Sequence, residues 1–202
     1  MGDTSAPDKP LAPAPMPAAD KPPAPAIAVF CVGSTLMLDD GLGPAVYQEM
    51  QVYDCEPPVD FFDVGCMSLD YLNAVEKYDL IITVDALDGT ESDPGTIFRF
   101  DPDDMARRSP GTQSLHDLKL SDLFDSAILL GYTARGVCLG MQVQNSSPAQ
   151  VTVGLTPPVY EKLADLVDCV LAELVGAGVQ VTERETGKLV EPGFHHTLKS
   201  DG

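Results

Sequence analysis

Five apolar runs along the chain predict the strands of one sheet. The runs at residues 27–32, 80–84 and 137–143 are the most continuously apolar, and those at 59–63 and 96–100 include polar residues. Several of them are almost continuously apolar, which is typical of strands that are buried on both faces of a parallel sheet.

Segments with helical spacing separate these runs. Apolar residues recur every three or four positions from about 42 to 51, after Ser68, around 120–127 and from Thr156 to Gly176. Such spacing is typical of amphipathic helices. The alternation of strands and helices predicts an α/β fold with a mostly parallel twisted sheet and helices on both faces.

The two ends of the chain lack this patterning. Residues 1–26 are rich in Pro and Ala and have no periodicity, so we expect a disordered leader. We expect one α/β domain at 27–177 and a loose polar tail at 178–202. No run is long and apolar enough to span a membrane, and the N-terminus lacks a secretory signal. The five cysteines form no CxxC pair, which favours a reducing, cytoplasmic location.

The charge balance excludes several kinds of partner. The sequence has 12 basic and 31 acidic residues, which gives a formal net charge of −19. Such a chain cannot neutralise a row of phosphates, so nucleic acid is excluded as a partner. An anionic membrane surface is also disfavoured.

Carboxylates follow three of the predicted strands. Asp39 and Asp40 follow the first, Asp63 ends the second and Asp85 follows the third. In a parallel sheet these positions meet at one edge, where ligands bind. Converging like charges raise one another's pKa unless a cation is present, so the pattern favours a metal site or paired acids for acid–base chemistry. Asp also caps helices, and that is the simpler reading for Asp39. Asp63 could equally accept hydrogen bonds from loop amides.

His116 is the imidazole that best suits this edge. It opens a predicted helix after a polar loop, whereas His195 and His196 lie in the predicted tail. A lone histidine is more often structural. Two carboxylates and one imidazole nevertheless suit a borderline divalent ion such as Ni²⁺, Zn²⁺ or Mn²⁺.

Other catalytic patterns are absent from the sequence. The loop after the first strand is neither GxGxxG nor a Walker loop, and no GxSxG elbow occurs. Cys66 lies near the acidic edge but has no basic neighbour in sequence to stabilise a thiolate.

Ordered short motifs resemble those of the nickel–iron hydrogenase maturation endopeptidases. They cover roughly residues 27–176 and are, in order, Val32-Gly33, Leu38-Asp39-Asp40-Gly41-Leu42-Gly43, Asp63-Val64-Gly65 with Leu69, Thr83-Val84-Asp85-Ala86, Pro94-Gly95-Thr96, Ser114-Leu115-His116 and Gly154-Leu155-Thr156-Pro157. Ser34 stands where the family usually has Asn, and Asp40 stands where some members have Glu.

The resemblance implies a five-stranded sheet between helices and a single activity. Members remove a C-terminal extension from the hydrogenase large-subunit precursor once Ni²⁺ is inserted, and they recognise that substrate nickel. By motif position, its contacts fall on Asp40, Asp85 and His116. The alternative is a nickel carrier or chaperone of the same fold that cleaves nothing.

Overall fold

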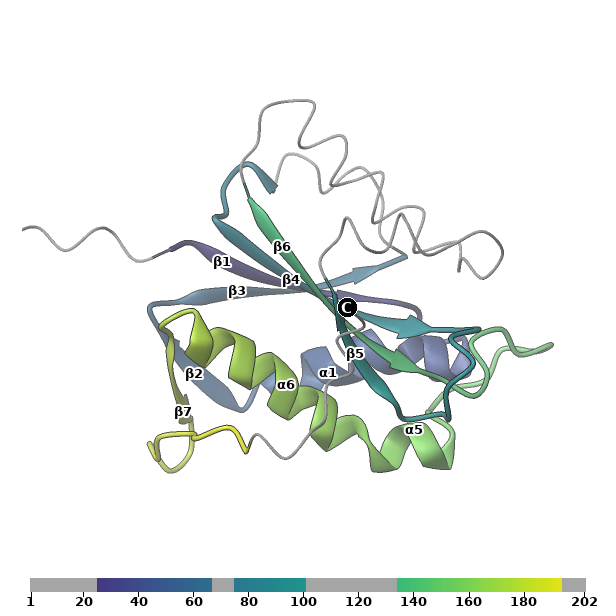
Figure 1. The fold of residues 1–202 in the computed structure, drawn as a ribbon. Helices are drawn as coiled ribbons and strands as arrows, with labels where there is room; N and C mark the ends of the chain where they lie inside the picture. Colours follow the sequence, from purple (N-terminus) through teal and green to yellow (C-terminus); the bar gives the residue numbers. More distant parts are fainter. Residues whose placement is uncertain (1–24, 67–74, 101–133, 194–202) are drawn as a thin grey trace, which may run out of the picture.

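Five strands form one mixed sheet at the centre of the molecule (Figure 1). The computed structural model describes residues 25–66, 75–100 and 134–193. The sheet order is β3-β1-β4-β6-β5, in which only β5 is antiparallel to its neighbour. The strands are β1 (Ile27–Val32), β3 (Val59–Gly65), β4 (Leu80–Leu87), β5 (Ile97–Phe100) and β6 (Arg135–Gln142). The prediction of an α/β fold with a mostly parallel sheet is confirmed.

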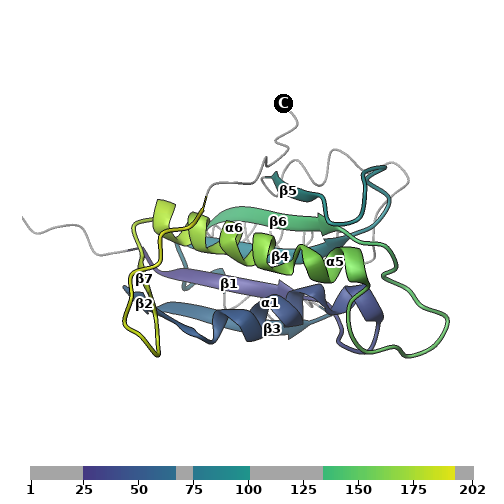
Figure 2. The same cartoon turned by 90° about the horizontal axis from the view of Figure 1, so that it is seen from below.

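Two helices cover one face of this sheet. The helix α1 (Leu42–Met50) follows a short 3₁₀ segment, η1 (Leu38–Gly41), and α6 (Leu163–Gly176) follows the short helix α5 (Pro157–Glu161). Figure 2 shows α1 and α6 lying side by side across the strands. The helix expected from Ser68 lies mostly outside the described residues, and the one expected around 120–127 lies wholly outside them.

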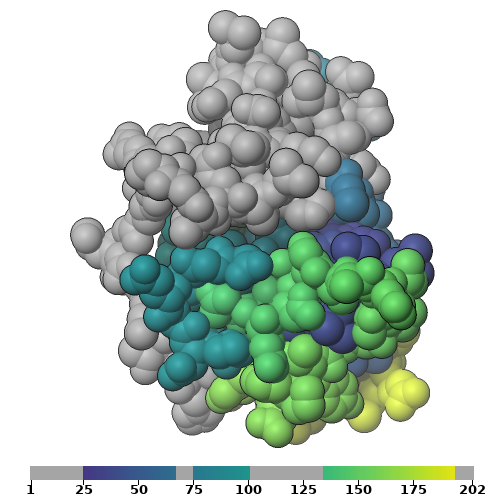
Figure 3. All heavy atoms as spheres, turned by 90° about the vertical axis from the view of Figure 1, so that its right-hand side faces the viewer, coloured from purple at the N-terminus to yellow at the C-terminus, as the bar shows by residue number. Residues whose placement is uncertain are grey.

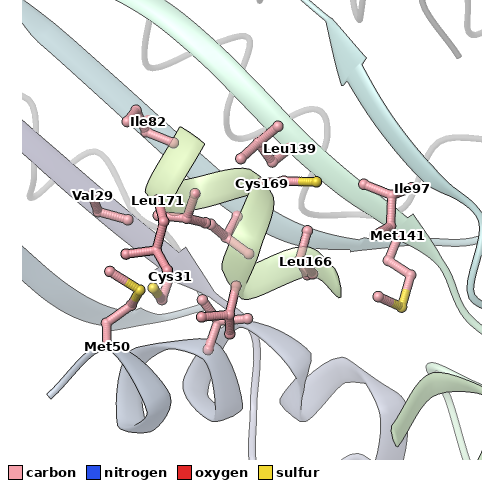
Figure 4. Close-up of a cluster of buried hydrophobic side chains, with 14 of the residues drawn as sticks. Val29, Cys31, Met50, Ile82, Ile97, Leu139, Met141, Leu166, Cys169 and Leu171 are labelled. Carbon is pink, nitrogen blue, oxygen red and sulfur yellow. The ribbon is translucent and has the colours of Figure 1, made fainter. Parts of the chain in front are cut away.

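The core divides into two layers because neighbouring residues of a strand point to opposite faces. In β1, Ile27, Val29 and Cys31 belong to the larger cluster, beneath α1 and α6. Ala28, Phe30 and Val32 belong to the smaller cluster on the other face. Figure 4 shows the larger cluster, where Leu166 and Leu171 of α6 meet side chains of the central strands. Both faces of β1 and β4 are buried, which explains their unbroken apolar runs.

A two-stranded antiparallel sheet corrects the prediction of a loose tail from Gly178. Residues Gln180–Glu183 form β7, which pairs with β2 (Tyr53–Glu56). Val181 is fully buried, so its burial fixes the start of this segment to the domain. Both strands have four residues, and β2 alternates between half-buried and exposed positions, so neither gives the long apolar run of a central strand.

Several element boundaries also differ from the prediction, among them the start of β6 at Arg135. The second strand continues through the expected exit residues Val64 and Gly65, and the third continues past Asp85 to Leu87. The latter extends because Asp85, Ala86 and Leu87 keep pairing with β6. The single helix expected from Thr156 to Gly176 is broken at Lys162, whose backbone has φ −102° and ψ 1°. None of the helices described here has the length and hydropathy to cross a bilayer.

Candidate active site

The loop after β1 folds back tightly because of Gly33. Its φ is +127°, and a Cβ at this position would lie 1.8 Å from the main-chain oxygen of Asp40. A side chain is therefore excluded on both steric and conformational grounds. The Gly33 N–H donates to the carbonyl of Gly65, 2.8 Å away, which ties the end of β1 to the end of β3.

Asp40 lies in η1, at the carboxyl edge of the sheet. Only 5% of its surface is exposed, and its Oδ2 accepts a hydrogen bond of 2.8 Å from the Ser34 N–H. Gly43 fixes η1 and α1 against β1, since a Cβ there would lie 2.0 Å from the main-chain oxygen of Val32. Asp40 is thus held by a close contact between the backbones of α1 and β1.

Asp85 reaches the same edge from the neighbouring strand. β1 and β4 pair in parallel up to Cys31 opposite Val84, so Asp85 stands level with the last residue of β1. It is 3% exposed, and its Oδ1 accepts a hydrogen bond of 2.8 Å from the Ala86 N–H. Val84 faces α1 and α6, so the alternation of the strand directs Asp85 to the opposite face of the sheet. The segment η1 lies against β4, which brings the Asp40 and Asp85 segments together.

Asp39 has a structural role, but it does not cap the following helix as expected, since α1 begins after Gly41 without a side-chain cap hydrogen bond. It is completely buried. Its Oδ1 accepts from the Thr156 N–H at 2.6 Å, and its Oδ2 accepts from the Gln144 and Asn145 N–H groups at 3.1 and 2.9 Å and from the Thr156 hydroxyl at 2.9 Å. This carboxylate joins η1 to both ends of the 144–156 segment. Sequence reasoning missed these partners, although the Gly154-Leu155-Thr156-Pro157 motif pointed to their region.

Leu38, directly before the two aspartates, has a strained backbone. Its φ is +52°, a left-handed conformation that is costly for a residue with a branched side chain. Its N–H donates to the Thr152 carbonyl at 2.7 Å. The hydrogen bonds to the 144–156 segment therefore hold η1 in a conformation that Leu38 alone would disfavour.

The other candidate site residues, Asp63 and the three histidines, are not shown beside Asp40 and Asp85. Asp63 is exposed within β3 and accepts a hydrogen bond of 3.3 Å from the Gly65 N–H, as expected for a carboxylate that binds loop amides. His116, His195 and His196 lie outside the described residues. Within 25–66, 75–100 and 134–193, no three His, Cys, Asp or Glu side chains are grouped closely enough to hold a metal ion. The described part of the site therefore provides two carboxylates, and a third ligand remains a prediction.

Buried thiols near the sheet are poor nucleophiles. Burial, together with the charge of Asp63, raises the pKa of the Cys31 thiol to about 12. Burial raises the pKa of Cys169 to about 11, with a contribution from Asp168. Both thiols stay protonated at neutral pH, and only a thiolate attacks effectively. Cys66 is exposed just beyond β3.

Figure 3 looks onto the edge of the molecule at the carboxyl ends of β1 and β4, where the purple residues after β1 and the green residues after β6 lie side by side.

The fold and the site define an α/β protein with two nearly buried carboxylates at the carboxyl ends of adjacent parallel strands. Such an arrangement can bind a cation or exchange protons with a substrate.

Comparison with known proteins identifies the family. The model of the hydrogenase maturation proteases (HycI) matches residues 44–173, and the chain belongs to this family. It is 29% identical over 181 residues to the hydrogenase expression/formation protein HupD of Rhizobium leguminosarum bv. viciae, with 88% of each chain covered. It is 26% identical over 161 residues to the hydrogenase 2 maturation protease of Escherichia coli, covering 79% of this chain and 96% of that one.

Solved structures agree with this assignment. The hydrogenase-maturating endopeptidase HybD of Escherichia coli superimposes with a TM-score of 0.72 at 25% identity, covering 79% of this chain and 98% of that one. A maturation protease from Thermococcus kodakarensis shares the fold at a TM-score of 0.62 and 17% identity. The chain is therefore a hydrolase of the maturation-protease class, with the five-stranded sheet of that class.

Proposed function

We propose that this protein is an endopeptidase that removes the C-terminal extension of the nickel–iron hydrogenase large-subunit precursor after Ni²⁺ insertion. The supporting observation is the pair Asp40 and Asp85, two nearly buried carboxylates at one edge of the sheet in a member of this family. Together with His116, they contact the nickel of the precursor. The nickel is part of the substrate, and the protease needs no metal of its own.

This contact aligns the scissile peptide. Burying two like charges at one edge is costly, and a divalent cation offsets that cost. Nickel binding therefore stabilises the complex with the precursor and places the peptide carbonyl beside the carboxylates. A precursor without nickel offers these carboxylates no cation and binds in a non-productive way, which explains why cleavage would wait for metal insertion.

Water attacks the carbonyl in this proposal. Within the described residues, the buried Cys31 and Cys169 thiols stay protonated, and the sequence contains no GxSxG elbow, so we assign the attack to water and not to either of these thiols or a serine of that motif. The substrate nickel can polarise the carbonyl, and a site carboxylate can take the proton from the attacking water.

The test mixes the purified protein with nickel-loaded and nickel-free precursor and follows the mass of the large subunit. Loss of the extension only from the nickel-loaded precursor is the expected result. An unchanged mass in both samples would overturn the proposed cleavage. In that case, tight stoichiometric nickel in the purified protein would indicate the alternative role of a nickel carrier.

A further inference from the structure

Three exposed aliphatic side chains lie beside the candidate active site. Leu36, Val151 and Val153 are 53%, 69% and 73% exposed. Leu36 lies in the loop between β1 and η1, and the two valines lie in the segment between β6 and α5. We call these three residues the apolar patch.

Backbone hydrogen bonds join the two parts of the apolar patch. Met37 and Thr152 form a parallel β-bridge. The Thr152 N–H donates to the Leu36 carbonyl at 3.0 Å, and the Thr152 carbonyl accepts from the Leu38 N–H at 2.7 Å. Leu36 and Val151 directly precede the bridged residues, and Val153 directly follows Thr152. Because successive residues of extended chain alternate in direction, Val151 and Val153 lie on the side opposite to Thr152, and the backbone hydrogen bond from Thr152 holds Leu36 next to them.

The patch is also held rigidly against the site. The carboxylate of Asp39 binds the main chain at Gln144, Asn145 and Thr156, at both ends of the segment that carries the valines. The next residue in the chain is Asp40, whose carboxylate accepts from Ser34, two residues before Leu36. Anything that binds to the patch therefore lies against the candidate site, with little loop entropy to lose.

The absence of charge is unusual for this chain. Charged residues make up 21% of the sequence, yet residues 33–38 and 143–160, which lie outside the buried strands β1 and β6, contain no Asp, Glu, Lys or Arg. A solvent-exposed loop that needed only solubility would share the acidity of the rest of the surface. Asp88, which accepts a hydrogen bond from the Ser146 hydroxyl, is a charged residue at the β6 end of this segment. Exposed apolar groups in segments that lack charged residues of their own are typical of protein interfaces, where charged residues are depleted.

We propose that the apolar patch is the docking surface for the hydrogenase large-subunit precursor, an inference that rests on the proposed function. It binds an apolar, uncharged part of the precursor near the cleavage point. The patch supplies binding energy that is the same before and during the reaction, while Asp40 and Asp85 act on the nickel and the scissile peptide. Removing the patch therefore raises KM and leaves kcat unchanged.

The test compares the double variant Val151→Ser/Val153→Ser with the control Val52→Ser/Leu189→Ser. The control removes two apolar side chains of comparable exposure, 52% and 48%, beside the β2–β7 sheet. With nickel-loaded precursor, we expect the patch variant to show a KM raised about tenfold or more with kcat within about twofold of wild type. The control keeps both constants near wild type. Thermal unfolding of each variant verifies that the fold is intact.

Unchanged KM in the patch variant, or an equal rise in the control, would overturn the docking surface while leaving the proposed protease intact. Direct titration with both forms of the precursor separates the two proposals further. If wild type binds precursor but does not cleave it, the proposed cleavage fails, and weaker binding by the patch variant still supports docking. Absence of binding by wild type to either form overturns the docking surface.

Discussion

Asp39 and Asp40 are neighbours in the chain with different surroundings. The Asp39 carboxylate accepts hydrogen bonds from three main-chain N–H groups and one hydroxyl, so both of its oxygens stabilise the fold. Asp40 instead accepts a hydrogen bond from the Ser34 N–H, at the edge where the strands end. The two roles differ because the 3₁₀ segment η1 places the Asp39 carboxylate against the 144–156 segment and the Asp40 carboxylate toward the end of β1.

Replacing Asp39 by Asn is expected to destabilise the protein. An amide keeps one oxygen, so its NH₂ group must face at least one N–H donor that Asp39 now accepts from. We expect the free energy of unfolding to fall by about 1–3 kcal/mol, measured by urea denaturation. The matched control is Asp63→Asn, because Asp63 is exposed and accepts one hydrogen bond of 3.3 Å. Equal stability of the two variants would contradict the structural role of Asp39.

Replacing Asp85 by Asn is expected to remove activity with little loss of stability. The amide oxygen can still accept from the Ala86 N–H, so the local fold is kept, but the negative charge is lost. We expect processing of nickel-loaded precursor to slow by about 100-fold or more, followed by mass spectrometry. Asp88→Asn is the control, since Asp88 is exposed at the same end of β4 and bonds the Ser146 hydroxyl. Full processing by the Asp85 variant would exclude this carboxylate from the reaction.

The elements at the active edge pack through their backbones. α1 meets the end of β1 at Gly43, where the nearest backbone atom would lie 2.0 Å from a Cβ. In an ordinary helix, Gly→Ala stabilises by up to about 1 kcal/mol. Gly43→Ala is expected to destabilise the protein instead. We expect the free energy of unfolding to fall by about 3 kcal/mol or more, because neither the backbone of α1 nor that of β1 can move away from the added Cβ.

Gly176→Ala is the matched control for this prediction. Gly176 ends α6, and no atom lies within 4 Å of a Cβ built there, so we expect a gain of about 0.5 kcal/mol. Thermal or urea unfolding of both variants measures these changes in the free energy of unfolding. A stabilised Gly43→Ala variant would show that α1 does not press against β1.

The same packing explains which elements could be predicted from the sequence. The bounds of β1 and the start of β4 were predicted correctly because every residue of these strands is buried and the apolar run is unbroken. β2 and β7 were missed because each has four residues, of which β2 buries none fully and β7 buries only Val181, a pattern that the sequence does not distinguish from a loop. The acidic edge was predictable because parallel strands end together. The hydrogen bonds from Gln144 and Thr156 to Asp39 could not be predicted, since they join residues more than 100 positions apart in the sequence.

At the scale of the whole molecule, the buried thiols make stability depend on alkaline pH. The pKa is about 12 for Cys31 and about 11 for Cys169 in the folded protein, against an ordinary value of 9.0. Between these values the unfolded chain loses protons that the native state keeps, so the free energy of unfolding falls as the pH rises from about 9 toward 12. Below pH 9 these thiols are protonated in both states and contribute no pH dependence.

Urea unfolding under reducing conditions at pH 7 and pH 10.5 tests this prediction with the variant Cys31→Ala/Cys169→Ala. The variant is less stable at pH 7 because two buried sulfur atoms are lost. It should nevertheless lose less stability than wild type between the two pH values. Repulsion within a chain of formal charge −19 also grows with pH, but it acts on both proteins alike. The difference between the two losses therefore isolates the thiols, and equal losses would show that their burial does not govern alkaline stability.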